Sequence, residues 1–171
     1  MTEEIELLFP IIDEPKNGSG EIVFILTSDA VDIIRNLLIH MIKKKMIPYL
    51  RNSCGNTIEE ECVYTAMVEL PWADQAKQAI EIELSTSGKL IFDPNLLRLF
   101  LLDQGFTQVD HGGARIIMRV VQWVAFIIYQ SIQYYLQHII GKKKLVNSIL
   151  VLEAIRENEI LADILRGCVL N

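Results

Sequence analysis

At 171 residues, with 51% apolar side chains and a mean hydropathy of +0.29, the chain is too apolar for a disordered tail and can bury a substantial core. Its formal net charge of −6 argues against nucleic-acid binding through bulk charge, because polyanions are bound chiefly by lysine and arginine. The charge is uneven, since residues 1–88 carry 7 basic and 15 acidic side chains whereas residues 89–171 carry 9 and 7.

The first long helix is expected to begin at Thr27 or Ser28, either of which can act as its N-cap. Apolar residues then recur at three-to-four spacing, which is the stripe of an amphipathic helix, and three lysines follow at 43–45. Pro48 has no amide hydrogen and its ring crowds the carbonyl four residues earlier, so we expect a kink or an early stop near Ile47.

A second, shorter helix follows a polar loop. Thr57 is expected to cap this helix, and Glu60 completes a Thr-x-x-Glu capping box. Pro71 ends it and starts another helix over residues 72–84. The segment Ser85–Lys89 is the predicted linker between two halves of the chain.

The second half begins with a short helix, for which Asp93 is the expected N-cap, Pro94 the first helical residue and Gly105 the end. A long helix over about 114–140 is apolar on nearly every side. Such a helix either spans a membrane or is covered by protein, and its glutamines and arginines would be costly in hydrocarbon. We therefore prefer a protein-covered helix and expect short helices over 147–155 and 156–167.

The three cysteines, Cys54, Cys62 and Cys168, show neither metal-ligand nor redox-motif spacing. An odd number without a signal-peptide pattern predicts reduced, buried thiols in a reducing compartment, with no disulfide framework. No phosphate-binding glycine loop, nucleophile arrangement or carboxylate pair appears, so we expect no enzyme activity, no cofactor and no metal.

The order of helix, loop, long helix, loop and short helix is that of the histone fold, and it occurs twice. The first half resembles core histone 2B in its second loop and third helix, and the second half resembles core histone 2A at both loops and at its last helices. The segments that carry the resemblance are TIEEECVYTAMVELPWADQAKQAI at 57–80, GGARI at 112–116, GKKKLV at 141–146 and LEAIRENEILADIL at 152–165.

The 2B-before-2A order is similar to that of the fused histone doublets of large DNA viruses of the Marseillevirus kind, in a short form without basic tails. The resemblance implies an all-α fold class, with residues 1–88 a histone 2B-like fold and residues 89–171 a histone 2A-like fold that form an intramolecular handshake heterodimer. It implies a structural protein that joins a fused histone 4 and 3 type doublet to wrap double-stranded DNA.

The same resemblance implies self-association across a pseudo-symmetric octamer-like particle, no membrane, and a location in the host nucleus or viral factory and the virion, a reducing intracellular compartment. In a handshake the first loop of each fold lies beside the second loop of the other. Wrapping then needs repeated contacts with the DNA backbone and no reading of bases. The implied DNA-binding residues are Thr27 and Ser28 with Lys142, Lys143 and Lys144 at one end, Asn56 and Thr57 with Arg115 at the other, and Arg98.

One departure concerns the acidic patch of histone 2A, because only Glu159 keeps its charge among the positions corresponding to that patch. An alternative also stays open. The acidic first half suits a histone-fold interaction module of the kind found in transcription-factor subunits, with little direct DNA binding.

Overall fold

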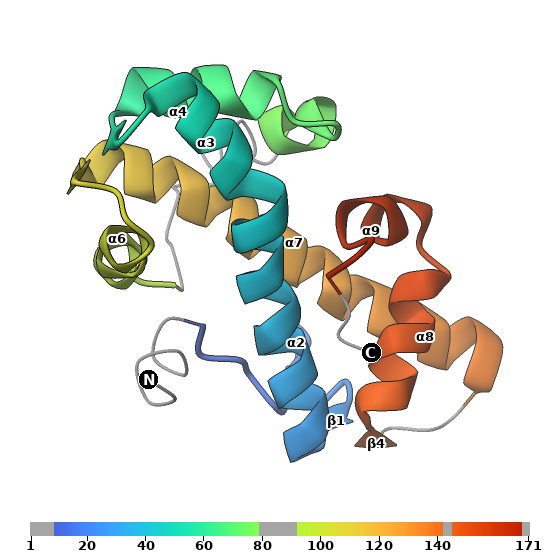
Figure 1. Cartoon of the computed structure of the whole chain (residues 1–171). Helices are drawn as coiled ribbons and strands as arrows, with labels where there is room; N and C mark the ends of the chain where they lie inside the picture. The colour runs from blue at the N-terminus through green and yellow to red at the C-terminus, as the bar shows by residue number, and fades with distance from the viewer. Residues whose placement is uncertain (1–8, 79–91, 142–144, 169–171) are drawn as a thin grey trace. The chain divides into compact units, whose positions relative to one another are not determined.

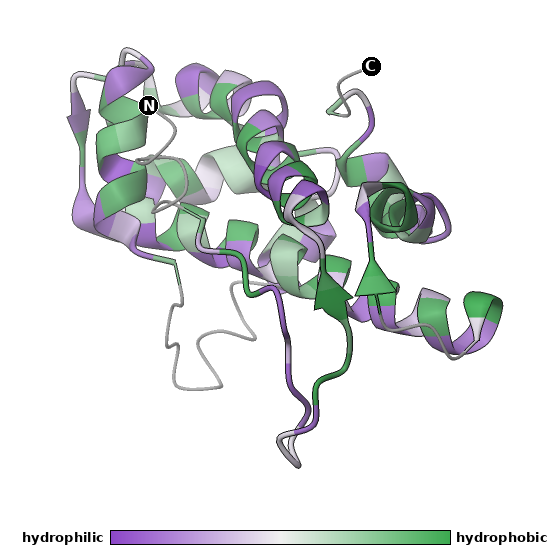
Figure 2. Ribbon diagram, turned by 90° about the horizontal axis from the view of Figure 1, so that it is seen from below, coloured by the Kyte–Doolittle hydropathy of each residue, from purple (hydrophilic) through white to green (hydrophobic). Residues whose placement is uncertain are grey.

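The computed structural model describes residues 9–78, 92–141 and 145–168 (Figure 1). The linker Ser85–Lys89 and the lysines at 142–144 lie outside these ranges. The chain is mostly helical, which confirms the all-α class. Figure 2 shows hydrophobic and hydrophilic residues alternating along the helices, as amphipathic patterning requires.

The chain forms two compact units, each of which draws on both halves of the sequence. Of the described residues, the first unit contains 9, 41–78 and 92–123, and the second contains 10–40, 124–141 and 145–168. These units do not coincide with the ranges 1–88 and 89–171, whose assignment as two separate histone folds stays a prediction. The long helices α2 (Ser28–Met41) and α7 (His111–Tyr135) each contribute residues to both units.

Within the first unit, helices alternate with two very short strands. After Met41 the elements are η1 (Ile42–Met46), α3 (Ile47–Cys54), β2 (Thr57–Ile58), α4 (Glu60–Val68), α6 (Pro94–Asp103), β3 (Gln108–Val109) and the first part of α7. Residues 73–78 are also helical.

The second unit has the same kinds of element. It contains β1 (Ile25–Leu26), most of α2, the second part of α7, η2 (Leu136–Ile140), β4 (Leu145–Val146), α8 (Ser148–Arg156) and α9 (Glu159–Ile164).

The interruption predicted around Pro48 is present. The α-helical register of α2 ends at Met41, and the five residues of η1 follow in π-helical register before α3 restarts at Ile47. Pro48 occupies the first turn of α3, where its missing amide hydrogen is tolerated because first-turn amides have no partner within the helix.

Two parallel strand pairs join distant parts of the sequence, one pair in each unit. In the second unit β1 pairs with β4, with Ile25 opposite Leu145 and Leu26 opposite Val146 (Figure 1). In the first unit β2 pairs with β3, with Thr57 opposite Gln108 and Ile58 opposite Val109. Each pair therefore joins a strand of the first half of the chain to one of the second half.

The apolar members of these ladders are buried and help to hold them. Leu26 and Val146 are buried in the second unit, and Ile58 and Val109 in the first. Burying such a side chain contributes roughly 1.5–3 kcal/mol, far more than a two-residue ladder can supply alone. The core of each unit thus fixes where its strand pair lies.

The segment from α7 through η2, residues 111–140, is the one described helix long and apolar enough to cross a membrane, with a mean hydropathy of 1.3 over its best window. Within that window 56% of the residues are buried inside the protein. Length and composition do not distinguish a span from the core helix of a folded protein, so this finding assigns neither.

The start of α7 packs closely on β2 and α4. Asp110 caps this helix, because its side chain accepts a hydrogen bond from the Gly113 amide at 3.0 Å. A methyl group at Gly113 would lie 3.0 Å from Cγ2 of Ile58 and 3.2 Å from Cγ2 of Val63. At the neighbouring Gly112, the closest atom is instead a carboxylate oxygen at the end of the flexible side chain of Glu60, at 2.6 Å.

We expect Gly113→Ala to lower the free energy of unfolding by up to about 2 kcal/mol. The added methyl group costs ~1–3 kcal/mol by overpacking the core, which exceeds the gain from the higher helix propensity of alanine. Gly112→Ala is the matched control and is expected to lower the free energy of unfolding less, since the closest atom belongs to the movable Glu60 side chain and the next, Oδ1 of Asp110, lies 3.2 Å away. Urea denaturation of both variants measures the difference. Equal effects of the two substitutions would show that α7 does not approach β2 this closely.

Candidate nucleic-acid interface

The first candidate surface is the β1–β4 end, which we define as residues 25–29 and 145–148 of the second unit. Beyond the ladder, the Thr27 amide donates to the Val146 carbonyl at 3.0 Å. The Thr27 hydroxyl donates to the Asp29 carboxylate, and the other oxygen of that carboxylate accepts from the Ser148 amide at 3.1 Å. Asp29 therefore connects the start of α2 to the start of α8, a contact that the sequence interpretation did not predict.

These contacts keep Asp29 charged. Hydrogen bonds from Thr27 and then from Ser148 lower the pKa of the Asp29 carboxyl from 3.8 to about 2. Of the predicted DNA-binding residues at this end, Ser28 is exposed, and Thr27 is partly buried with its hydroxyl engaged. Lys142, Lys143 and Lys144 lie outside the described residues, directly before β4 in the sequence.

The second candidate surface is the β2–β3 end, which we define as residues 56–58 and 107–110 of the first unit. The Asn56 carbonyl accepts from the amide of Thr107 at 2.8 Å and from its hydroxyl at 3.1 Å. The Asp110 amide donates to the Ile58 carbonyl at 2.9 Å. Asn56 and Thr57 are thus held beside residues 107–110 of the second half of the chain.

Arg51, which sequence reasoning did not single out, contacts both halves of the chain at this end. Its guanidinium lies 4.3 Å from the centre of the Phe106 ring, and it donates to the Gln104 carbonyl at 2.6 Å and to the Asn56 side chain at 3.3 Å. The contacts with Gln104 and Phe106 span more than fifty residues of sequence, so nothing local to Arg51 signals them.

An open cleft of about 840 Å³ lies at the β2–β3 end. Four carboxylates and one guanidinium line it, so its lining is acidic. It is bounded by Thr57, Ile58, Glu59, Glu60, Glu61, Tyr64, Arg98, Leu102, Thr107, Gln108, Val109 and Asp110.

The two arginines predicted to bind DNA at this end differ in their surroundings. Arg98 is half-buried in the cleft, and its Nε donates to the Val109 carbonyl at 3.1 Å while Nη1 reaches the Asn95 side chain at 3.4 Å. Arg115 is exposed on α7 and is not among the residues that line the cleft. The cleft therefore brings Thr57 and Arg98 together, and Arg115 is not part of its lining.

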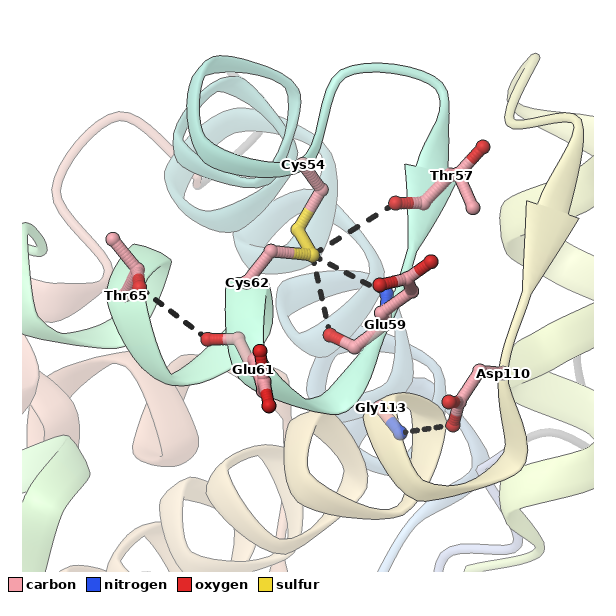
Figure 3. The surroundings of a disulfide bond; sticks show 8 residues. All are labelled: Cys54, Thr57, Glu59, Glu61, Cys62, Thr65, Asp110 and Gly113. Atoms are coloured by element: carbon pink, nitrogen blue, oxygen red, sulfur yellow. Dashed lines mark hydrogen bonds between the residues drawn. A yellow bond between two sulfur atoms is a disulfide. The ribbon is translucent and has the colours of Figure 1, made fainter.

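The cysteine prediction is wrong for two of the three residues. Cys54 and Cys62 form a disulfide between the end of α3 and the first turn of α4 (Figure 3). The reversal of the chain through β2 brings their Cα atoms to 5.2 Å, within the range that a disulfide spans. The odd cysteine count obscured this pair, whereas Cys168 is buried as expected and stays outside any disulfide.

The cap predicted for α4 is also wrong. Thr57 belongs to β2, and the helix begins at Glu60 with Glu59 as its N-cap. The Glu59 amide donates to Sγ of Cys62 at 3.2 Å, so Cys62 occupies the position in the capping box that Glu60 was expected to fill. The strand ladder uses Thr57 for pairing and delays the start of the helix.

The capping prediction for α6 is confirmed. Asp93 accepts from the Asn95 amide at 2.9 Å at the start of α6, and Pro94 is the first residue of that helix. This cap acts over two residues, which is why the local pattern predicts it. Asn147, expected only as part of the helix over 147–155, caps α8 by accepting from the Leu150 amide at 3.0 Å.

Where the resemblance would place an acidic patch, the second unit has a groove of about 620 Å³ with mixed character. The Asn158 side chain donates to the Ser131 hydroxyl at 2.7 Å inside it. Tyr134 and Ile160 are 59% and 44% exposed along it, so apolar surface occurs there beside the carboxylates of Glu157 and Glu159.

No family model matches the chain, and no curated protein matches it either. Within the described ranges, no three histidine, cysteine, aspartate or glutamate side chains are grouped so that they could hold a metal ion. The functional interpretation therefore depends on the geometry of the two paired-strand ends.

Asp29 gives the β1–β4 end a defined pH dependence. Its pKa is lower in the folded chain than the ordinary value, so the stability that it contributes is fully present above about pH 4 and is lost as the pH falls towards about 2. We expect Asp29→Asn to have a lower Tm than the wild type at about pH 6. The difference should shrink towards zero between about pH 4 and 2.

Thermal unfolding followed by circular dichroism across this pH range measures the effect. Asp32→Asn is the matched control, because Asp32 is an exposed carboxylate on the same helix that pairs with Arg35 one turn away at 3.3 Å. This variant should differ less from the wild type. A deficit of Asp29→Asn that does not vary with pH would contradict the assigned role of the carboxylate.

Proposed function

We propose that the chain is a structural DNA-packaging protein of the histone-doublet type, which joins a fused histone 4 and 3 type doublet to wrap double-stranded DNA. The observation that carries the proposal is the crossed pairing of four short strands. β1 precedes the first long helical segment and pairs with β4, which follows the second long helical segment. Conversely, β2 follows the first long helical segment and pairs with β3, which precedes the second. A handshake between two histone folds implies this crossed pairing.

The order of elements also supports the proposal. In the second half α6, β3, α7, β4 and α8 follow one another as helix, strand, long helix, strand and short helix. In the first half β1, the segment from α2 to α3, β2 and α4 match the last four of these steps. Two such series in one chain correspond to a histone 2B-like fold followed by a histone 2A-like fold.

The proposed binding mode uses the phosphate backbone and reads no bases. Ser28, Asn56 and Arg115 are exposed polar residues at or near the paired-strand ends, and the lysines at 142–144 immediately precede β4. Because the net charge is −6, this chain alone should bind DNA weakly and depend on a more basic partner. Assembly across a pseudo-symmetric octamer-like particle, in the host nucleus or viral factory and the virion, belongs to the same proposal.

A second candidate function is a histone-fold interaction module with little direct DNA binding. The acidic lining of the cleft at the β2–β3 end favours it, since Glu59, Glu60, Glu61 and Asp110 would repel phosphate there. The two candidate functions differ in whether the β1–β4 end contacts DNA. The lysines at 142–144, which immediately precede β4 in the sequence, are therefore the residues to change in a test.

The discriminating experiment mixes the full chain with a fused histone 4 and 3 type doublet and about 150 base pairs of DNA, followed by nuclease digestion. Packaging predicts a protected fragment that is lost or shortened when Lys142, Lys143 and Lys144 are all changed to Glu. The same triple variant should reduce the slope of log K against log salt by about 2–3, since each lost phosphate contact removes about 0.9.

The matched control reverses three exposed charges away from both ends, Lys16→Glu, Lys77→Glu and Arg166→Glu, and so gives the same net charge. This control should retain protection. Equal loss in both triple variants would mean that bulk charge alone matters, and absence of protection with the unaltered chain would favour the interaction module.

A further inference from the structure

The Cys54–Cys62 disulfide closes a loop that contains all of β2. Figure 3 shows Cys54 at the end of α3, Cys62 in the first turn of α4, and the backbone of Thr57 and Glu59 gathered around the Cys62 sulfur. The bond therefore fixes both ends of the short segment that the first half of the chain contributes to the β2–β3 end.

That segment accepts the backbone hydrogen bonds of its partner strand on both sides of the ladder. The Thr107 amide donates to the Asn56 carbonyl at 2.8 Å, and the Asp110 amide donates to the Ile58 carbonyl at 2.9 Å. A change in the freedom of residues 55–61 is therefore transmitted directly to the amides of residues 107 and 110.

The two bonded cysteines are more exposed than the third. Cys54 and Cys62 are partly exposed, whereas Cys168 is 1% exposed. A small thiol such as glutathione can attack the first pair, and the buried third cysteine is protected from the same reagents.

The reduced state has a hydrogen-bonding alternative for Cys62. Its Sγ lies 3.2 Å from the Glu59 carbonyl and 3.8 Å from the Thr57 carbonyl. A thiol has a hydrogen to donate to these oxygens, and a disulfide sulfur has none. Reduction can therefore leave the first turn of α4 closed while it releases the connection to α3.

We infer that Cys54 and Cys62 form a thiol–disulfide exchange site that sets the rigidity of the β2–β3 end according to the surrounding glutathione pool. One glutathione thiolate attacks a sulfur of the bond, and the other sulfur leaves as a thiolate and takes up a proton. A second glutathione thiolate then attacks the mixed disulfide, which releases glutathione disulfide and the second cysteine thiol. Two electrons pass from two glutathiones to the protein, and glutathione disulfide reverses the reaction.

The biological use of this site rests on the proposed function. Disulfides persist in particles outside cells and are reduced in the cytosol, so a packaged form would hold the bond closed and an intracellular form would open it. The β2–β3 end would then be rigid in the particle and more mobile during assembly and release.

Hydrogen exchange of the full chain, equilibrated in buffers of defined glutathione to glutathione disulfide ratio, tests the site. Intact mass after thiol alkylation reports the redox state. In the reduced chain, the amides of Thr107 and Asp110 should exchange at least about ten-fold faster than in the oxidised chain. The Thr27 amide, bonded to Val146 at the other end, is the internal control and should change little.

The variant Cys54→Ser/Cys62→Ser should exchange at the reduced rate in every buffer, and Cys168→Ala should keep the wild-type response. The alkylated reduced wild type gives the same reading if the double variant does not fold. Equal rates in the oxidised and reduced chain, equal acceleration at Thr27, or a chain that forms no disulfide under glutathione disulfide would overturn the inference. No DNA is present, so this outcome is independent of the nuclease-protection result.

Discussion

Burial of an apolar residue on each of four very short strands is the constraint on which their crossed pairing depends. Each ladder has two residue pairs and could not persist in water alone. Burial of one apolar residue on each strand, such as Leu26 on β1 and Ile58 on β2, fixes the register, because a slip by one residue would expose it. The polar groups beside the ladders, including Asp29 and Asn56, owe their positions to this buried register.

The two ends use the same backbone arrangement for different electrostatics. At the β1–β4 end a single carboxylate, Asp29, is already satisfied by Thr27 and by the start of α8. At the β2–β3 end the run Glu59–Glu61 lines an open cleft, and the nearby guanidinium of Arg98 donates to a backbone carbonyl. A polyanion is therefore repelled more strongly at the second end, although both ends have the same strand geometry.

Features that depend on neighbouring residues could be predicted from the sequence, and features that depend on distant ones could not. The Asp93 cap and the interruption before Pro48 follow from steric and hydrogen-bonding rules within one turn. The contact of Asp29 with Ser148 crosses more than a hundred residues, and no local pattern indicates it. The disulfide could have been suspected from the sequence, since Cys54 and Cys62 lie on either side of a predicted loop. The odd number of cysteines led instead to the prediction of reduced thiols.

The difference in charge between the two paired-strand ends bears on which function the fold can serve. A symmetric DNA-wrapping module would need comparable attraction at both ends. Here two guanidinium groups at the second end, those of Arg51 and Arg98, are engaged with backbone or ring partners. Phosphate contact at that end would depend on neutral donors such as Asn56, whose strength depends on how rigidly they are held. At the β2–β3 end the strand pairing positions neutral donors, but few cations are available to attract phosphate. The disulfide between Cys54 and Cys62 would therefore matter more at this end than at the other. Under the proposed packaging function, rigidity at the β2–β3 end would compensate for the acidic lining only while Cys54 and Cys62 are joined.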